Sequence, residues 1–350
     1  MDEMHETTEE TYLGDQINSN AKHASTISKR RAKGFGIISD ILQILDVIGD
    51  NRKRIEVGLI LRQAWFINAL LVNMEAWHNV LKKDTDIFTK LDHYLMRKIL
   101  GTHSKVPSEM LYLETATIPI EFILASRRIN FLHNILIKEN TELTKRVYEA
   151  QVKNPCKGDW SMLVKEDMVK VGITLTDTEI SEMSKPDFKQ LVRKAVKNAT
   201  FISLKVTQSE HTKIQNIIYN EFNIQPYLKS DCFSIEEASI LFNMRASTLN
   251  GFKMCFPSVY RNDKQCKLQC LDEDTIEHTF TCHKLKHQDK NPSVHFSAIF
   301  ASVNHQKNAV SKFIKLLTIR SALLEAGPAY QGIVLDTAAS ATAGVAGEGP

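Results

Sequence analysis

Apolar residues recur at the three- and four-residue spacing of an α-helix through most of this chain. A clear example follows the basic run SKRRAKG (28–34), where one apolar stripe consists of Ile38, Ile41, Leu42, Leu45 and Ile48. That spacing places the side chains on one face of a helix, and such a face is normally buried against another element. The pattern predicts a mainly α fold. At 350 residues the chain is long enough to bury at least one core.

Capping and helix-breaking residues predict where several helices begin and end. Glycines close helices and prolines open them, whereas a Ser followed three residues later by an acidic residue satisfies free N–H groups at a helix start. The predicted ends are Gly49 and Gly101, and the predicted starts are Pro107, Pro119, Ser184 with Asp187, Ser234 with Glu237, and Asp84 or Thr85. In the helix after residue 84, the predicted inner face is Ile87, Leu91, Tyr94 and Leu95.

The most apolar stretch, VGLILRQAWFINALLVNMEAW (57–77), predicts part of one long buried helix over about 53–80. It contains Arg62, Gln63, Asn68, Asn73 and Glu75, so a core helix is expected there rather than a membrane span. The start MDEMHETTEETY is acidic and polar, unlike a signal peptide. We therefore expect an intracellular protein, nuclear or cytoplasmic, with no membrane partner.

Four potential metal ligands lie close together near the end of the chain. Cys266, Cys270, His278 and Cys282 follow the spacing C-x3-C-x7-H-x3-C. His278 and Cys282 are four residues apart, so on a helix they project from one face. Three thiolates and one imidazole form the closed tetrahedral set that structural zinc prefers. The cluster therefore predicts a structural zinc site, with a chance grouping of the four residues as the simpler explanation.

Several other residues bear on this prediction. Asp274 or Thr275 is expected to cap the helix that presents the ring nitrogen. Substitute ligands are Cys255, His283 and His287. With six cysteines and no export signal, reduced thiols are expected rather than a disulfide framework, and Cys156, Cys232 and Cys255 are expected to be ordinary core or surface thiols. A nucleophilic role is disfavoured because no base and orienting group can be identified.

Basic residues are concentrated in two segments, although the net charge is only +3. Residues 22–62 contain nine Lys/Arg and four Asp/Glu, and residues 185–205 contain six Lys/Arg and one Asp. Such local excess suits a polyanion partner. A solvated helix face explains it equally well.

Several quoted stretches resemble a known family when they are taken in order. YLG (12–14), LRQAWFINALLVNMEAW (61–77) and LDHYLMRKILGTHSKVPSEMLYLETATIPIEFILASRRINFLHNIL (91–136) precede the Cys/His cluster. This order resembles the C-terminal part of non-LTR (LINE-like) retrotransposon reverse transcriptases over residues 12–290. The most specific pieces are MLYLE (110–114), IPI (118–120) and SRRINFLH (126–133).

The resemblance implies a division of the chain into segments and a nucleic-acid partner. Tyr12, Leu13 and Gly14 would end the palm near the primer-gripping turn, and the Cys/His residues would form a knuckle that contacts RNA or DNA without sequence preference. The implied segments are 1–20 (end of a palm-like region and disordered N-terminus), 21–150 (thumb-like helical domain), 151–255 (helical connector), 256–290 (CCHC zinc knuckle), 291–327 (C-terminal helix) and 328–350 (disordered tail).

The chain departs from this family where the chemistry would lie. A polymerase of this type needs paired aspartates to hold Mg²⁺ ions, and two adjacent aspartates occur nowhere in the sequence. The resemblance therefore implies a nucleic-acid-binding remnant of such a reverse transcriptase that lacks the catalytic palm. No catalytic residue is predicted, and Mg²⁺ is expected only if a palm is encoded upstream. Two alternatives stay open. One is a zinc-stapled helical protein-interaction module, and the other is a truncated gene model of an active RNA-directed DNA polymerase.

Candidate phosphate-binding residues lie in the two basic segments. They are Lys29, Arg30, Arg31 and Lys33, expected just before a helix, and Arg193, Lys194 and Lys197. Arg127 and Arg128 are less specific, since Arg128 is also expected to pair with Glu121 or Glu139. Trp65, Trp77 and Trp160 could stack on bases, but Trp65 and Trp77 lie in a buried-helix pattern and are expected in the core.

Overall fold

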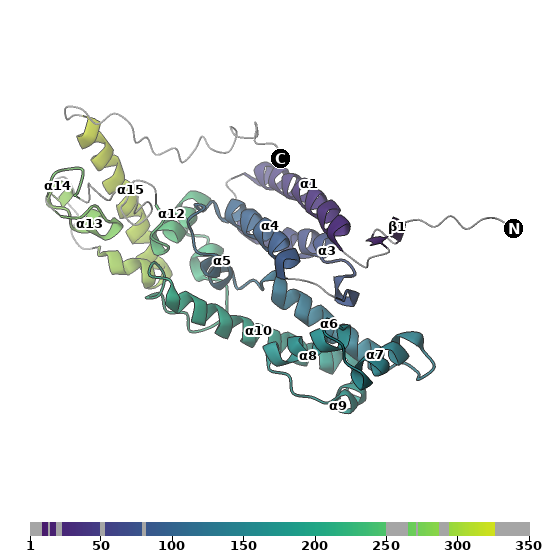
Figure 1. The fold of residues 1–350 in the computed structure, drawn as a ribbon. Helices are drawn as coiled ribbons and strands as arrows, with labels where there is room; N and C mark the ends of the chain where they lie inside the picture. The colour runs from purple at the N-terminus through teal and green to yellow at the C-terminus, as the bar shows by residue number, and fades with distance from the viewer. Residues whose placement is uncertain are drawn as a thin grey trace. The chain divides into compact units, whose positions relative to one another are not determined.

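The computed structural model describes residues 9–12, 15–18, 23–49, 53–78, 82–249, 265–270, 272–286 and 294–325 (Figure 1). It divides into two compact units, Met1–Ala238 and Ser239–Pro350. The fold is mainly α, as the periodicity predicts. Strands β1 (Glu9–Tyr12) and β2 (Asp15–Asn18) form one antiparallel pair in which Tyr12 is opposite Asp15.

The helices of the first unit follow in chain order. They are α1 (Ala24–Ile48), α2 (Lys53–Leu61), the π-helical turn η1 (Arg62–Phe66), α3 (Ile67–Leu70), the 3-10 turn η2 (Met74–Ala76), α4 (Lys82–Leu100), α5 (Ser108–Thr115), α6 (Ile120–Leu136), α7 (Leu143–Lys153), α8 (Trp160–Val171), α9 (Asp177–Glu182), α10 (Lys185–Glu210) and α11 (Pro226–Lys229). The chain continues into the second unit through α12 (Ile235–Arg245), and then α13 (Ile276–Thr281), α14 (His283–Lys286), η3 (Phe296–Phe300) and α15 (Val303–Glu325).

Helix α1 begins fourteen residues before the first residue of its predicted apolar stripe. It starts at Ala24 after His23, whose side chain makes no capping hydrogen bond. The basic run 28–34 therefore lies inside the helix, and the expectation that it precedes a helix was wrong. Ile38, Ile41 and Leu45 are buried, as predicted, against α4 and neighbouring helices. Gly49 ends the helix at φ 63°, and its N–H donates to the carbonyls of Leu45 and Asp46.

The single long helix expected over 53–80 is interrupted. The π-helical turn η1 follows α2, and the helical path ends after Leu70, with Asn73 in the left-handed region at φ 57°. A π turn inserts an extra residue into the helical ladder, which changes the direction of the side chains around it. The apolar spacing is not interrupted at this insertion, so the spacing alone predicts one continuous helix.

A buried ion pair lies at the start of this π turn. Arg62 donates from Nε and Nη2 to the two carboxylate oxygens of Asp92 on α4, both at 2.6 Å, and its Nη2 also donates to the carbonyl of Ile118. The Tyr112 hydroxyl donates to the same carboxylate at 2.9 Å. Burial opposes the charge of Arg62, but attraction to Asp92 and the hydrogen bonds outweigh it and raise the arginine pKa. The pair joins α4 to the π turn.

Helices α2 and α4 meet closely at Gly58. A Cβ added to Gly58 would lie 2.8 Å from Cγ2 of Ile99, closer than real Cβ atoms approach. Gly58→Ala is therefore expected to lower the free energy of unfolding by about 1–3 kcal/mol, because the two helices must separate. Gly36→Ala in α1 is the matched control, since nothing lies within 4 Å of its added Cβ. It should raise that free energy by up to about 1 kcal/mol through helix propensity. Urea unfolding of both variants tests this, and equal shifts would contradict it.

Helices α6 to α10 of the first unit enclose an apolar core of their own. It includes Trp160 and Val164 of α8 and Phe188 and Val192 of α10, packed against α6. Arg128 of α6 pairs across this core with Asp167, at 2.6 Å. The predicted partners of Arg128 were therefore wrong: Glu121 instead pairs with Lys170 at 2.6 Å.

A buried carboxylate joins α5 to the end of the first unit. Glu114 is completely buried and accepts hydrogen bonds from the hydroxyls of Tyr219 (2.5 Å) and Tyr227 (2.9 Å). The backbone N–H of Gln225 donates to the Glu114 carbonyl at 2.8 Å. The segment after α10 is thereby fastened to a helix more than one hundred residues earlier.

The predicted caps are largely present. Ser234 and Glu237 form the reciprocal capping box, and the Ser184 hydroxyl accepts from the N–H of Asp187. Pro107 and Pro119 precede α5 and α6, and Gly101 follows α4 at φ 60°. Two details of α4 differ from expectation, since it begins at Lys82 and Tyr94 is 44% exposed. Among the described residues, no helix combines the length and apolar content needed to cross a membrane.

Candidate metal centre

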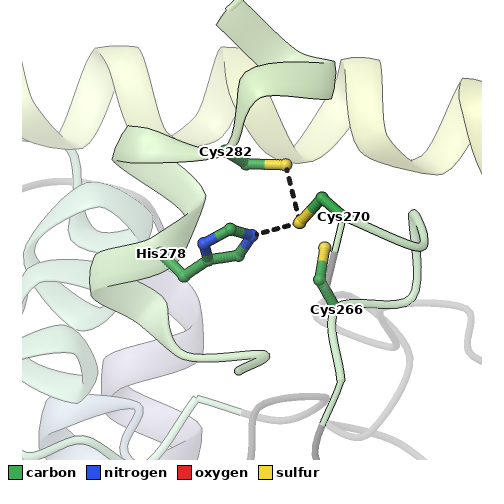
Figure 2. Close-up of side chains that lie close together, drawn as sticks. All are labelled: Cys266, Cys270, His278 and Cys282. Atoms are coloured by element: carbon green, nitrogen blue, oxygen red, sulfur yellow. Dashed lines mark hydrogen bonds between the residues drawn. The ribbon is translucent and has the colours of Figure 1, made fainter. Parts of the chain in front are cut away.

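The four predicted ligands come together in the second unit. Cys266 and Cys270 lie on a loop, His278 on α13, and Cys282 directly after α13 (Figure 2). All four side chains are buried, and their ligand atoms lie within 4.8 Å of one another. Among the described residues, this is the group of His, Cys, Asp and Glu side chains placed to share a metal ion.

Local backbone structure sets the two halves of the site. The N–H of Cys266 donates to the Asp272 carbonyl, and the N–H of Gln269 donates to the Cys266 carbonyl, both at 2.7 Å. Gln269 adopts the left-handed conformation at φ 58°, which turns the chain sharply before Cys270. These contacts fold the loop so that both of its sulfurs face α13.

The helical half depends on a threonine cap. Thr275 Oγ1 accepts from the N–H of His278 at 3.0 Å, so of the two predicted cap residues it is Thr275 that caps α13. The N–H of Cys282 donates to the His278 carbonyl at 2.7 Å, which continues the last turn. The ring and the third sulfur therefore project from one face, as their four-residue spacing predicts.

The geometry fits a tetrahedral ion. Zinc–sulfur bonds of about 2.3 Å at tetrahedral angles place two sulfurs about 3.8 Å apart. The sulfurs of Cys270 and Cys282 are 3.7 Å apart, which matches this spacing (Figure 2). Nε2 of His278 lies 2.9 Å from the sulfur of Cys270, a hydrogen-bond distance that must lengthen to about 3.6 Å when both atoms bind one zinc ion. Three sulfurs and one nitrogen complete the coordination of zinc and leave no position for a substrate.

Burial adjusts the protonation of the ligands. It raises the pKa of the Cys266 thiol to about 12 and also raises the pKa of Cys282. Burial lowers the pKa of His278, which favours the neutral ring with a free lone pair. Metal binding displaces the thiol protons and leaves three buried thiolates. The positive charge of the metal ion balances the negative charge of these thiolates.

The surroundings of the site include two acidic residues that the ligand spacing did not single out. Oδ2 of Asp272 lies 3.6 Å from Nδ1 of His278, the nitrogen that faces away from the sulfurs. At 3.6 Å from a carboxylate that is 69% exposed, this is an electrostatic contact rather than a hydrogen bond, and it favours the proton on Nδ1 rather than on Nε2. Asp274 is buried and accepts a 2.6 Å hydrogen bond from Arg320 of α15. No short motif predicts that contact, because the partners lie 46 residues apart.

Helix α15 covers the cysteines with apolar side chains. Leu316 of α15 and Leu285 of α14 form a buried cluster with the three cysteines. Ile319 and Leu323 of α15 pack against this cluster. Phe313 of α15 stacks on Phe280 of α13, with ring centroids 5.7 Å apart. The site is therefore part of the core of the second unit rather than a surface loop.

The other candidate ligands do not join this group. His283 is exposed and lies outside the cluster, and Cys156 and Cys232 are exposed free thiols. Cys255 and His287 lie outside the described residues, as do Leu13, Gly14 and the tail 328–350. The five described cysteines form no disulfide with one another.

The basic candidates divide by burial. Arg30 is buried, donates to the Leu70 carbonyl and lies 4.6 Å from the centre of the Trp77 ring. Its role in α1 is therefore structural, and its guanidinium is not displayed to a phosphate. The remaining candidates are exposed: Lys29, Arg31 and Lys33 on α1, and Arg193, Lys194 and Lys197 on α10.

The tryptophans also differ in exposure. Trp77 and Trp160 are buried, and Nε1 of Trp160 donates to the Glu75 carbonyl at 2.7 Å. Trp65 is 38% exposed on the π-helical turn, so the expectation that it lies fully in the core was wrong. The π turn explains the difference, because it displaces this residue from the face that simple helical spacing assigns to it.

Fold and site together define the class of this protein. It is a mainly α-helical protein with a buried Cys₃His group that can hold a metal ion such as zinc. Comparison with protein-family models, curated proteins and solved structures gave no match to the chain.

Proposed function

We propose that this chain is a zinc-stabilised helical protein that binds RNA or a template–primer duplex without sequence preference. The observation on which the proposal rests is the buried Cys₃His group with its ligand atoms within 4.8 Å of one another. A closed set of three sulfurs and one ring nitrogen suits structural zinc rather than catalytic zinc, which keeps an open position.

Exposed basic side chains on two long helices support the nucleic-acid part of the proposal. Arg193, Lys194 and Lys197 lie on α10, and Lys29, Arg31 and Lys33 lie on α1. Lysines and arginines on helix faces bind the phosphate backbone irrespective of base sequence. Both helices belong to the first unit, so the proposed phosphate contacts do not require the metal centre to touch the nucleic acid.

The sequence resemblance supports an origin in the C-terminal part of a non-LTR retrotransposon reverse transcriptase. In this proposal Tyr12, Leu13 and Gly14 end a palm-like region, and the segments are thumb-like (21–150), connector (151–255), knuckle (256–290), C-terminal helix (291–327) and tail (328–350). No catalytic residue is assigned, and Mg²⁺ belongs to the proposal only if a palm with paired aspartates is encoded upstream. Nuclear or cytoplasmic localisation is part of the same proposal.

The salt dependence of binding tests the proposed phosphate contacts. Replacing Arg193, Lys194 and Lys197 together by Gln is expected to reduce the slope of log affinity against log salt by about three. The measurement is fluorescence anisotropy with a single-stranded RNA and with an RNA–DNA duplex. A matched triple Gln variant of the exposed Lys82, Lys83 and Lys90 on α4 should leave the slope unchanged. Absence of binding at low salt, or equal effects of the two variants, would contradict the proposal.

A second candidate function is a protein-interaction module held together by zinc. The protein-interaction part of this alternative is favoured by an apolar groove between α8 and α10 in the first unit.

A further inference from the structure

A large hollow in the first unit lies beside α10. It has a volume of about 1010 Å³, and its walls are the end of α8, the loop 172–175 and one face of α10. Leu191, Ala195, Ala199 and Ile202 of α10 line it at successive helical turns. The groove is separate from the Cys₃His site, and the fold of the first unit does not fill it.

Large apolar side chains are exposed on both walls. Val169 at the end of α8 is 80% exposed, and Ile202 on α10 is 64% exposed. Leu175 and Met183, both partly buried, add apolar surface between them, whereas Ile173 in the lining is buried. Contiguous exposed apolar surface with a polar rim is typical of an interaction site.

The charged side chains around the groove are mainly basic. Lys194 lines it from α10, and Lys197, outside the lining, is exposed one helical turn further along. Lys170 lines it from α8 and pairs at 2.6 Å with Glu121 of α6. Asp187 is the acidic residue of the lining, and its carboxylate accepts a 2.6 Å hydrogen bond from Ser184. An occupant with acidic groups beside its apolar face complements this arrangement.

The shape of the groove favours a helical occupant. Its α10 wall runs from Asp187 to Ser203, about 24 Å at the rise of an α-helix, which matches an occupant of about four turns. The principal walls are helices whose backbone groups are already paired, so strand addition to a free sheet edge is excluded there. Aliphatic side chains predominate in the lining, whereas nucleic-acid bases bind by stacking on aromatic rings.

We propose that this groove binds an acidic amphipathic helix of a partner protein. Apolar side chains of that helix fill the space along Leu191, Ala195 and Ala199, and its acidic flanks face Lys170 and Lys194. The proposal is independent of zinc binding and goes beyond the nucleic-acid function, although Lys194 belongs to both proposed surfaces.

The test is fluorescence anisotropy of the full chain with a panel of labelled helical peptides of about four turns. Each peptide has apolar residues at helical spacing, varied among Leu, Ile, Phe and Met, and glutamates on both flanks. Each is paired with a version whose glutamates are replaced by lysines. Acidic members are expected to bind at least about tenfold more tightly than their lysine counterparts, and the preference should weaken as salt rises.

Substitutions in the groove test whether the acidic peptides bind there. Ile202→Glu and Lys194→Glu are expected to weaken binding of the acidic peptides at least about tenfold, because each places negative charge against the acidic flanks. Val47→Glu is the matched control, since Val47 is 90% exposed on α1 and lies outside the groove lining. Circular dichroism of each variant shows whether the fold is retained, and both groove positions are exposed.

Three results would overturn the proposal. In the first, no acidic peptide binds more tightly than its lysine counterpart. In the second, Ile202→Glu weakens RNA binding as much as peptide binding, which would assign the groove to nucleic acid. In the third, the wild-type chain self-associates and Ile202→Glu abolishes that association, which would make a second copy the occupant.

Discussion

Removal of the metal is expected to unfold the C-terminal unit while the helices of the first unit stay folded. Helices α13 and α14 have six and four residues, too short to be stable alone, and their apolar partners are the cysteines and α15. Structural zinc contributes on the order of 10–16 kcal/mol of apparent binding free energy in small zinc-finger peptides. Without it, the buried sulfurs have no counter-charge and α15 loses the surface against which it packs.

Hydrogen exchange before and after chelation measures this effect. Protection should disappear in α13 and α15 and persist in α6 and α10, and metal analysis of the untreated protein should give one zinc per chain. Cys282→Ser should reproduce the apo state, whereas Cys232→Ser should not, because Cys232 is exposed outside the site. Untreated protein that is free of metal, with sulfurs that react at once with a thiol reagent, would refute the zinc assignment.

Breaking the buried ion pair of the first unit should also strongly lower the free energy of unfolding. Arg62→Met or Asp92→Leu alone is expected to lower the free energy of unfolding by about 3–5 kcal/mol, because each leaves one charge buried without a partner. The double variant should lose much less, since neither charge is present. Adding Tyr112→Phe to the double variant should recover more, because the Tyr112 hydroxyl otherwise lacks its acceptor.

Urea unfolding followed by tryptophan fluorescence tests these variants. Arg54→Met is the matched control, since Arg54 pairs at 3.2 Å with Asp46, whose side chain is largely exposed. Exposed pairs contribute about 1 kcal/mol or less. If Arg62→Met costs no more than Arg54→Met, the buried pair does not stabilise the fold as described.

Features that depend on a few neighbouring residues could be predicted from the sequence. The capping box of Ser234 and Glu237 and the helix end at Gly49 involve contacts within one turn, so local spacing specifies them. The Cys₃His site belongs to the same class: one tight turn and one helical turn present all four ligands.

Features that depend on tertiary contacts could not be predicted in the same way. Nothing in the apolar pattern distinguishes Asp167 from nearer carboxylates as the partner of Arg128, because the choice depends on how α8 packs against α6. The π turn at Arg62 and the start of α1 without a side-chain cap leave no local signal either. Arg30 was assigned to a phosphate for the same reason, since its burial depends on Leu70 and Trp77 forty or more residues away.

The sealed carboxylate of Glu114 has a consequence for the order of events during synthesis. Its two tyrosine partners are translated 105 and 113 residues after it. Until both have been synthesised, the carboxylate of Glu114 lacks their hydroxyl donors and cannot be buried with its hydrogen bonds satisfied. Contacts between such distant positions slow folding, because a long loop must close first. A nascent chain arrested at the end of α10 should therefore remain open around α5, and elongation past Tyr227 should complete the fold.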